Sequence, residues 1–418
     1  MKRGGFAPFV MVTALVFALA PLATLAPTAR PALSLLPVVT AAPAFAQAAK
    51  PAIKIGFITT LTGGQSAAGK EMEEGFRLAL DEVRGEVAGR RLQLIVEDDE
   101  FKPDVGLTKT RRLIERDQVH LLAGVLGSGV SLAVGSYIAG TGTPLVITNA
   151  IAKALTQEKR SPNIFRTSWA GGQAYFPFGA YVVGKLGYKR LVVAYAGYAA
   201  GQDMAGGFTP YFNAAGGEVV ETVAPPLGTA DFAPYLTKIA ARAGTVDAVW
   251  AWFPGADAVR FVKQYVEFGL KQKIPLIAGG SLVEEQVLPE QGRDALGIIS
   301  ADIYTPTWES PENRAFVAAF QKRYKVTPSR YADQGYTGAR VIIEALKAVN
   351  GQVEDLPRFL EVLRKVEVVT GRGPTRFDQH QNAILNVQIR QVREVAGRID
   401  NVVVEVIPGV DQYWKPPR

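Results

Sequence analysis

The sequence contains no cysteine and very little histidine. Among its 418 residues there are no cysteines and only two histidines, His120 and His380. Without cysteine, the chain has no disulfide, no thiolate nucleophile, no cysteine-ligated zinc and no iron–sulfur cluster. With only two histidines, the chain has few candidate ligands for a histidine-based metal site and few candidate bases for an acid–base relay. We therefore expect no metal site in this protein.

A strong charge of either sign is also absent. Residues 1–46 carry three basic side chains, Lys2, Arg3 and Arg30, and no acidic one, which leaves 43 of the 46 basic residues against 39 acidic ones in the rest of the chain. No run of basic residues and no aromatic-plus-basic cluster occurs, so we do not expect a nucleic-acid partner. The composition, 48% hydrophobic and 20% charged, is that of an ordinary globular protein with room for two domains.

The first 46 residues have the pattern of an export signal. Lys2 and Arg3 precede the apolar run FAPFVMVTALVFALA, and residues 44–46 read Ala-Phe-Ala. A small residue, any residue and a second small residue form the site that signal peptidase cleaves. The alternative is a retained membrane anchor, but five prolines argue against a stable span: Pro8, Pro21, Pro27, Pro31 and Pro37. We expect cleavage near Ala46 and a periplasmic protein.

From residue 52 onward, strand patterns alternate with helix patterns. Two groups of apolar strands lie within residues 52–166 and 167–301, with one helix pattern between successive strands. This alternation predicts right-handed crossovers and parallel sheets covered on both faces. The expected fold class is therefore α/β, with two doubly wound parallel-sheet lobes. We expect residues 302–370 to complete lobe 1. Residues 371–415, with short strands at 385–389 and 402–406, would complete lobe 2, so that three crossings near 167, 302 and 370 form a hinge.

Two consecutive strands of the first group end in polar turns, Gly-Ser-Gly at 127–129 and Asn149-Ala150. Ligands of open parallel sheets bind at the carboxyl ends of the strands. The sequence around Ser131 departs from G-x-S-x-G at its last residue, and no phosphate loop or dinucleotide fingerprint occurs. No general base is recognisable either. Hydroxyl and backbone N–H groups at helix starts remain, and these suit a small carboxylate that is held without being transformed. We expect no catalytic residue and no cofactor.

Segments along residues 52–410 resemble the exported solute-binding proteins of ABC importers. They include IKIGFITTLTG, EMEEGFRLALDEV, TPLVITNAIAKALT, NIFRTSW, DAVWAWFPGADAVRFVKQYVEFGL and PTRFDQHQNA. The likeness is to the branch typified by the leucine/isoleucine/valine-binding protein, the type I periplasmic binding proteins. It implies two α/β lobes that close on one small solute, and delivery of that solute to a membrane permease by a monomer. It also implies that the protein is not an enzyme.

The resemblance further implies a set of ligand-binding positions. The ligand carboxylate would meet a serine and the turn after the next strand, and the second lobe would add aromatic side chains and a glycine turn. The corresponding residues are Ser128, Asn149, Ala150 and Ile151 in lobe 1, and Tyr198, Trp252, Phe253 and Ser281 in lobe 2. Trp169 would add flat apolar surface. Ala68 stands where a tyrosine often closes the first loop and would add room.

Each of these positions also has a structural interpretation. Ser128 could cap a helix, and Asn149 could form an Asx turn. Trp252, Phe253 and Trp169 could pack in the core or the hinge. Of the two tryptophans in the strand that ends at residue 252, we assign Trp250 to the core.

Two departures from the family pattern bear on the ligand. Ile151 lacks the hydroxyl of the usual threonine, and Ser281 stands where amino-acid binders commonly carry an acid. A buried α-ammonium needs a countercharge, which is then missing unless Glu284, Glu285 or Asp203 supplies it. We therefore expect an aromatic or other ammonium-free carboxylate. Two alternatives stay open: a branched-chain or other hydrophobic amino acid, and a ligand sensor for a membrane receptor.

Overall fold

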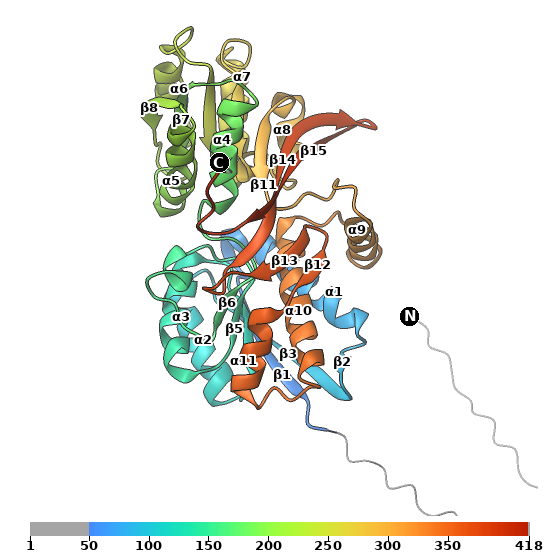
Figure 1. Ribbon diagram of the computed structural model, residues 1–418. Coiled ribbons are helices and arrows are strands. Elements are labelled where there is room, and N and C mark those ends of the chain that lie inside the picture. Colours follow the sequence, from blue (N-terminus) through green and yellow to red (C-terminus); the bar gives the residue numbers. More distant parts are fainter. Residues whose placement is uncertain (1–49, 417–418) are drawn as a thin grey trace, which may run out of the picture. The chain divides into compact units, whose positions relative to one another are not determined.

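The computed structural model describes residues 50–416. The expected signal segment, residues 1–46, lies outside the described residues. Within residues 50–416, no helix is long and apolar enough to cross a membrane. Two sheets organise this part of the chain, and both belong to one compact unit (Figure 1).

The first sheet is almost entirely parallel. Its strand order is β2-β3-β1-β4-β5-β6, and only β2 runs antiparallel to its neighbour. The strands are β1 (Ile53–Thr59), β2 (Glu86–Val87), β3 (Arg90–Asp98), β4 (Leu121–Gly124), β5 (Leu145–Ile147) and β6 (Ile164–Arg166). Alternation along β1 sends Ile55 and Phe57 to one face, whereas Ile58 packs on the other. Both faces are thus apolar, as a doubly covered sheet requires.

Helices cover both faces of the first sheet (Figure 1). One layer contains α2 (Pro103–Glu115) and α3 (Ser128–Thr141), which pack on each other. The other contains α1 (Ser66–Glu82), α10 (Arg330–Ala348) and α11 (Leu356–Lys365), with α9 (Pro311–Tyr324) beside α1. Helices α1 and α10 approach so closely that a Cβ on Gly75 would lie 1.9 Å from the carbonyl oxygen of Ala332. Glycine is therefore required at this crossing.

The second sheet begins as a parallel sheet. In order, β8 (Glu218–Val223), β7 (Arg190–Tyr195), β9 (Ala248–Trp252), β10 (Leu276–Gly279) and β11 (Ile299–Asp302) pair in parallel. Its helices are α4 (Phe176–Gly184), α5 (Ala199–Ala214), α6 (Ala233–Ala240), α7 (Gly255–Glu267) and the short α8 (Leu288–Gln291). Trp250 is fully buried and stacks on Phe208 of α5, with ring centroids 4.7 Å apart, which confirms its assignment to the core.

Antiparallel strands extend the second sheet beyond β11. They are β14 (Ala383–Val395), β13 (Gly373–Phe377) and β12 (Val368–Thr370), while β15 (Arg398–Val410) pairs with β14. The sheet is therefore mixed, although its centre is parallel and the α/β class is confirmed. The hairpin β14–β15 is much longer than the short strands that we predicted, because its polar tip continues the ladder past the apolar residues.

The segments that pass between the two sheets meet around a buried ion pair. Arg372 and Asp333 are both shielded from solvent, with Nε and Oδ2 2.7 Å apart. Arg372 also donates to the carbonyl oxygen of Thr167 at 3.1 Å, just after β6. A Cβ on Gly371 would lie 3.2 Å from the ring of Tyr304, which follows β11. Three crossings are thus packed together, while the lobe boundaries themselves stay a prediction.

Candidate binding site

Two loops at the carboxyl ends of β4 and β5 hold each other in place. The side-chain amide of Asn149 donates to the carbonyl oxygen of Leu126 at 2.8 Å, and the Ala150 N–H donates to that of Val125 at 3.0 Å. These bonds hold the two loops together, and contact of Asn149 and Ala150 with a ligand stays a prediction. Val125 itself has a φ of 67°, an uncommon conformation for a β-branched residue. Backbone strain of this kind is concentrated at functional sites.

Ser128 and Ile151 remain as donors on this edge of the first sheet. Ser128 is the first residue of α3, and its hydroxyl accepts a long 3.3 Å hydrogen bond from the Ile151 N–H. A weak bond of this length is readily exchanged for a better acceptor. Ser131, by contrast, donates to the Ser128 carbonyl at 2.8 Å and is fully buried. The structure therefore brings the predicted Ser128 and Ile151 together, and their contact with a ligand stays a prediction.

The start of α1 borders an open hollow. The hollow has a volume of about 430 Å³, and its lining residues are Leu61, Ser66, Ala67, Lys70 and Glu73. Ala68 is buried and is not part of this lining. Its neighbour Gly69 lies so close to Thr60 that a Cβ there would come within 1.8 Å of the Thr60 carbonyl oxygen. The first turn of α1 is thus pressed against the end of β1.

Of the four predicted aromatic residues, Tyr198 and Trp252 contact each other, and Trp169 lies on a segment that is bonded to Ile151. Trp252 ends β9, and its ring centroid is 6.1 Å from that of Tyr198 at the start of α5. Burial raises the pKa of Tyr198 to about 12. Trp169 lies on the segment after β6, which the Gly171 N–H ties to the carbonyl oxygen of Ile151 at 2.9 Å. The indole N–H of Trp169 is buried and has no hydrogen-bond partner among the described residues.

Phe253 takes a different place from Trp252. Its ring stacks on Phe261 of α7 at 4.5 Å and meets the edge of Phe232, and it is 1% exposed. Core packing therefore accounts for Phe253, which does not join the aromatic side chains around Tyr198. Ser281 lies in the buried turn Gly280–Val283 after β10, next to the charged residues described below.

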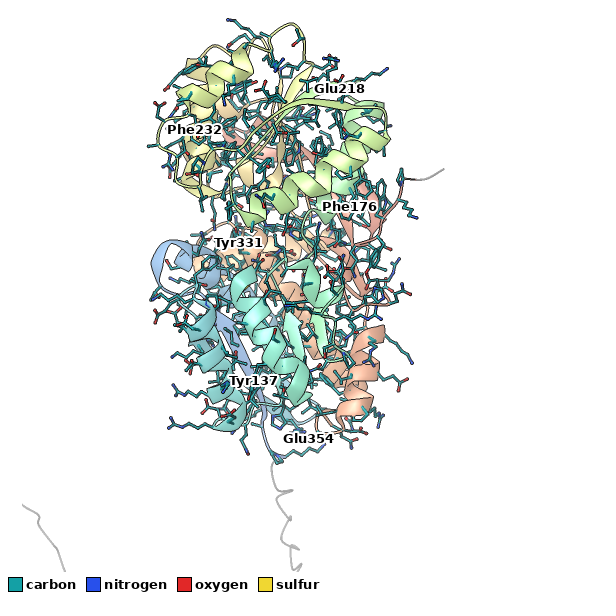
Figure 2. All side chains as sticks on the ribbon, turned by 90° about the vertical axis from the view of Figure 1, so that its left-hand side faces the viewer. Tyr137, Phe176, Glu218, Phe232, Tyr331 and Glu354 are labelled. Atoms are coloured by element: carbon teal, nitrogen blue, oxygen red, sulfur yellow. The ribbon has the colours of Figure 1, made fainter. Side chains whose placement is uncertain are left out.

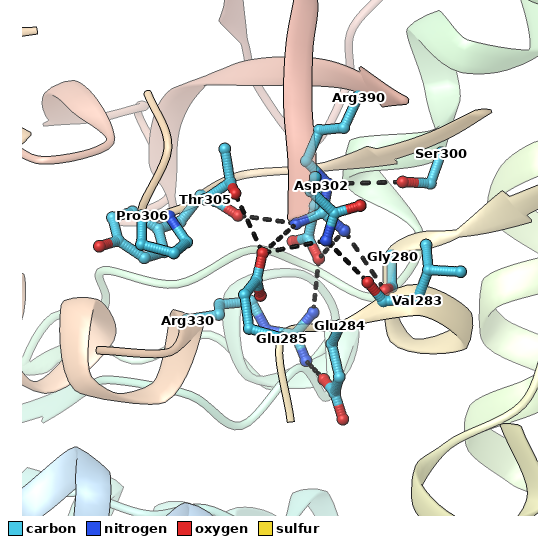
Figure 3. Close-up of polar contacts among 12 residues, drawn as sticks. Gly280, Val283, Glu284, Glu285, Ser300, Asp302, Thr305, Pro306, Arg330 and Arg390 are labelled. Atoms are coloured by element: carbon cyan, nitrogen blue, oxygen red, sulfur yellow. Dashed lines mark hydrogen bonds and ion pairs between the residues drawn. The ribbon is translucent and has the colours of Figure 1, made fainter. Parts of the chain in front are cut away.

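A buried network of charges fills the carboxyl end of the second sheet (Figure 3). Asp302, at the end of β11, pairs with Arg330 at 2.8 Å and with Arg390 of β14 at 3.3 Å. Glu284 pairs with Arg330 at 3.1 Å, and Glu285 pairs with Arg390 at 3.4 Å. Each of the two glutamates that sequence reasoning offered as countercharges is thus already matched by an arginine.

Arg330 occupies an unusual position, since it is the first residue of α10. A cation at a helix N-terminus is disfavoured by the helix dipole. Here the guanidinium lies between two rings, 5.1 Å from the centroids of both Trp169 and Tyr331. Burial works against its charge, but Asp302 and the neighbouring groups outweigh burial and raise its pKa. Cation–π contact and ion pairing together keep Arg330 charged in a water-poor position.

For Glu284, burial has a larger effect on the pKa than the neighbouring Arg330 charge. Burial raises its pKa to about 7, although Arg330 opposes this shift. Tyr331, labelled in Figure 2, borders the same group, and its hydroxyl lies 3.4 Å from Arg330 Nη2. Burial and the Arg330 pair thus act on Glu284 in opposite directions, and burial has the larger effect. Sequence reasoning missed Arg330, Asp302 and Arg390, because their partners come from separate elements.

Each of the two histidines contacts charged or polar groups. The ring of His120 accepts a hydrogen bond from the Lys54 N–H at 3.0 Å and lies 3.3 Å from Glu354. Glu354 and Tyr331 lie at opposite ends of the first sheet's layers (Figure 2). His380 contacts Arg160 and Tyr413 instead. Within residues 50–416, no group of three or more His, Asp or Glu side chains could hold a metal ion.

Comparison with known proteins agrees with this geometry. Residues 52–397 match the family model described as periplasmic binding protein. The chain belongs to this family. The Leu/Ile/Val-binding protein homolog 6 of Brucella melitensis is 30% identical over 346 residues, which cover 81% of this chain and 87% of that protein. This periplasmic binding protein is thus a type I solute-binding protein of the ABC-transporter kind, as its sequence segments predicted.

Two solved structures extend the comparison. An ABC transporter substrate-binding protein from Sphaerobacter thermophilus is 41% identical, with a TM-score of 0.85 over 87% of this chain and 99% of that one. A solute-binding protein of an ABC transporter from Rhodopseudomonas palustris BisB5, in complex with 3,4-dihydroxybenzoic acid, is 30% identical, with a TM-score of 0.80 over 87% and 99% of the chains. The family implies export to the periplasm, binding of a small molecule and delivery to a permease.

Proposed function

We propose that this periplasmic binding protein captures an aromatic or other ammonium-free carboxylate. The ligand would lie between the strand ends of the first sheet and the aromatic and charged groups at the ends of the second. The observation that carries this proposal is that Glu284, Glu285 and Asp302 each pair with Arg330 or Arg390, so that all three carboxylates are already engaged. An α-ammonium that entered this region would have to compete with the two arginines for these carboxylates, and its burial without a partner is strongly unfavourable.

The groups that remain available match such a ligand. The Ser128 hydroxyl and the Ile151 N–H can donate to a carboxylate, and they are weakly bonded to each other. Trp169 and Trp252 supply flat apolar surface, and the indole N–H of Trp169 has no partner among the described residues. This N–H group suits a ring hydroxyl or a second carboxylate oxygen. The 3,4-dihydroxybenzoic acid bound by the Rhodopseudomonas palustris protein is an ammonium-free aromatic acid.

A second candidate ligand is a branched-chain or other hydrophobic amino acid. The specific observation in its favour is Asp203 of α5, which forms no ion pair among the described residues. A Cβ on Gly171 would lie 3.5 Å from the Asp203 carboxylate, and Gly171 bonds to Ile151. Asp203 is therefore the acid that could receive an ammonium. The curated relative from Brucella melitensis is named as a Leu/Ile/Val-binding homologue.

The remaining parts of the proposal concern processing and partners. The signal segment would be removed near Ala46, and the protein would act as a monomer without chemistry on its ligand. The predicted lobes, residues 52–166 with 302–370 and residues 167–301 with 371–415, would close on the solute about the three crossings. The loaded protein would then dock on a membrane permease rather than on a receptor.

A titration of the exported, processed protein tests the ligand class. Benzoate, 3,4-dihydroxybenzoate, leucine and valine are compared by calorimetry and by thermal shift. A ligand at a hundredfold excess over its Kd stabilises by about 2.7 kcal/mol, which is easily detected. We expect the two aromatic acids to bind and the two amino acids to leave the melting temperature unchanged.

The variant Asp203→Asn separates the two candidates. If an amino acid binds, removal of the carboxylate abolishes its binding, whereas an ammonium-free acid binds the variant at least as well as the wild type. Binding of leucine with loss in Asp203→Asn would contradict our proposal and would establish the second candidate.

A further inference from the structure

Arg166 is buried without a carboxylate partner. It ends β6 and is fully shielded from solvent, and its guanidinium is bonded only to neutral acceptors. Nε donates to Asn382 Oδ1 at 2.7 Å, Nη1 donates to the carbonyl oxygen of Ala152 at 2.7 Å, and Nη2 donates to the hydroxyl of Thr156. No carboxylate of the described residues lies within ion-pairing distance of it.

The other large buried arginines differ from Arg166 because each pairs with a carboxylate. Arg330, Arg372 and Arg390 each have a carboxylate oxygen within 2.8, 2.7 and 3.3 Å, respectively. Burial lowers the pKa of Arg166 to about 9, and the charge of Asp378 opposes this shift only in part. The Asp378 oxygens accept from the backbone of His380 and Asn382 and from Gln412, so they are not aimed at the guanidinium.

An uncompensated interior cation is costly for a protein to keep. Hydrogen bonds to amide, carbonyl and hydroxyl oxygens satisfy the donors of Arg166 but do not neutralise it. Its positive field therefore extends into the surrounding low-dielectric region. An anion placed nearby would gain from that field, whereas a neutral ligand would not.

Arg166 lies directly behind the loop that carries the candidate carboxylate site. Its Nη1 bonds to Ala152, the residue that follows Ile151, and β6 pairs with β5, whose end begins this loop. The Ile151 N–H and the Ala152 carbonyl are separated by two residues of backbone. A carboxylate at the Ile151 N–H would thus lie on the order of 10 Å from the guanidinium.

We propose that Arg166 determines the preference of this site for an anionic ligand. Its unpaired charge favours a carboxylate at Ser128 and Ile151 over a neutral group of the same shape, without touching the ligand. The inference rests on the proposed carboxylate function. At about 10 Å and an effective dielectric constant near 20, the expected preference is on the order of tenfold in Kd.

The experiment compares a carboxylate with its neutral amide. Calorimetric Kd values for benzoate and benzamide are measured on the wild type and on Arg166→Gln. We expect the ratio of the two Kd values to fall about tenfold, through weaker benzoate binding, with benzamide changed less than threefold. The control Thr156→Val removes one hydrogen bond of Arg166 but keeps its charge, so the ratio should stay unchanged.

A second variant keeps the test decisive if Arg166→Gln does not fold. Asn382→Asp places a carboxylate on the acceptor that already bonds Arg166 Nε, and it should lower the benzoate-to-benzamide preference in the same direction. A purely structural arginine would give equal losses for both probes, and that result in either variant would overturn the inference.

The same design separates this inference from the proposed function. If the wild type binds leucine and not benzoate, the proposed ligand class fails, and the pair leucine and leucinamide carries the Arg166 test instead. A wild type that binds the amides as tightly as the acids would overturn the Arg166 inference whatever the ligand class.

Discussion

The carboxyl ends of the two sheets offer opposite kinds of surface. At the end of the first sheet, Ser128 and Ile151 present neutral donors that bond each other at 3.3 Å, with the unpaired Arg166 behind them. At the end of the second sheet, Asp302 and Glu284 are already matched by buried arginines. The first edge thus combines weakly bonded donors with a buried cation, whereas at the second edge three carboxylates pair with two arginines.

This difference bears on how a site between two edges selects its ligand. An edge with available donors and a buried cation favours the binding of an anionic group. An edge whose charges already pair with one another favours shape and apolar surface, because an added charge must disrupt existing pairs. In our proposal, the two edges together favour a ligand with one charged end and one flat end. The following predictions test each edge in turn, starting with the largest effect.

Breaking the ion network of the second sheet should have the largest effect on stability. Asp302→Ala leaves Arg330 and Arg390 without their shared carboxylate, and removing one member of a buried ion pair typically costs about 3–5 kcal/mol. Urea unfolding of the wild type and the variant measures this loss. Glu218→Ala, which removes an exposed pair with Arg190, is the control and should cost at most about 1 kcal/mol. Equal effects of the two substitutions would mean that the network is not energetically special.

Glu284 should make stability fall as pH rises through the neutral range. Its folded-state pKa is about 7, above the ordinary value of 4.5, so the folded protein binds a proton that the unfolded chain has released. The stabilisation is complete below pH 4.5 and is lost as pH rises to about 7, with a total on the order of 3 kcal/mol.

Unfolding at several pH values measures this dependence, and Glu284→Gln is the matched variant because it keeps the shape and removes the titration. Since burial also raises the pKa of Asp333, to about 6, the difference between wild type and variant isolates Glu284. Parallel stability curves for the two proteins would contradict the assignment.

Removing one donor from the first sheet's edge should affect binding and leave folding nearly intact. Ser128→Ala deletes a hydroxyl that we expect to bond an ionised carboxylate, which costs about 2 kcal/mol or roughly thirtyfold in Kd. Calorimetry with the bound acid measures the change. Ser131→Ala provides the contrast, because that hydroxyl already donates to the Ser128 carbonyl. Should both substitutions weaken binding alike, the placement of the carboxylate at Ser128 would be wrong.

Much of the fold could be predicted from the sequence, since apolar strands separated by single helices leave few alternatives. The antiparallel strands β12–β15 were harder to predict, because their polar, exposed ends lack the apolar pattern of the parallel core. The surroundings of some candidate site residues were easier to predict from the sequence than those of others. Trp252 and Phe253 are neighbours in sequence, yet period-two alternation sends one ring to Tyr198 and the other to Phe261.

Long-range pairing could not be predicted at all. The two glutamates near residue 284 were visible as candidate acids, but Arg390 reaches Glu285 across 105 residues of sequence and Arg330 reaches Glu284 across 46. No local pattern shows which arginine will find which carboxylate. The same holds for Arg166, whose significance lies in the lack of such a partner within the described residues.

The glycine crossing of α1 and α10 also has a consequence for the order in which the chain can fold. The hydroxyl of Tyr336 in α10 bonds to Glu82 in α1 across 254 residues of sequence. Until α10 is in place, the face of α1 that packs against it has no cover. Contacts this distant in sequence form slowly, because a long loop must close before they stabilise anything. The close contact that Gly75 permits between these helices can therefore form only once the chain as far as α10 is present.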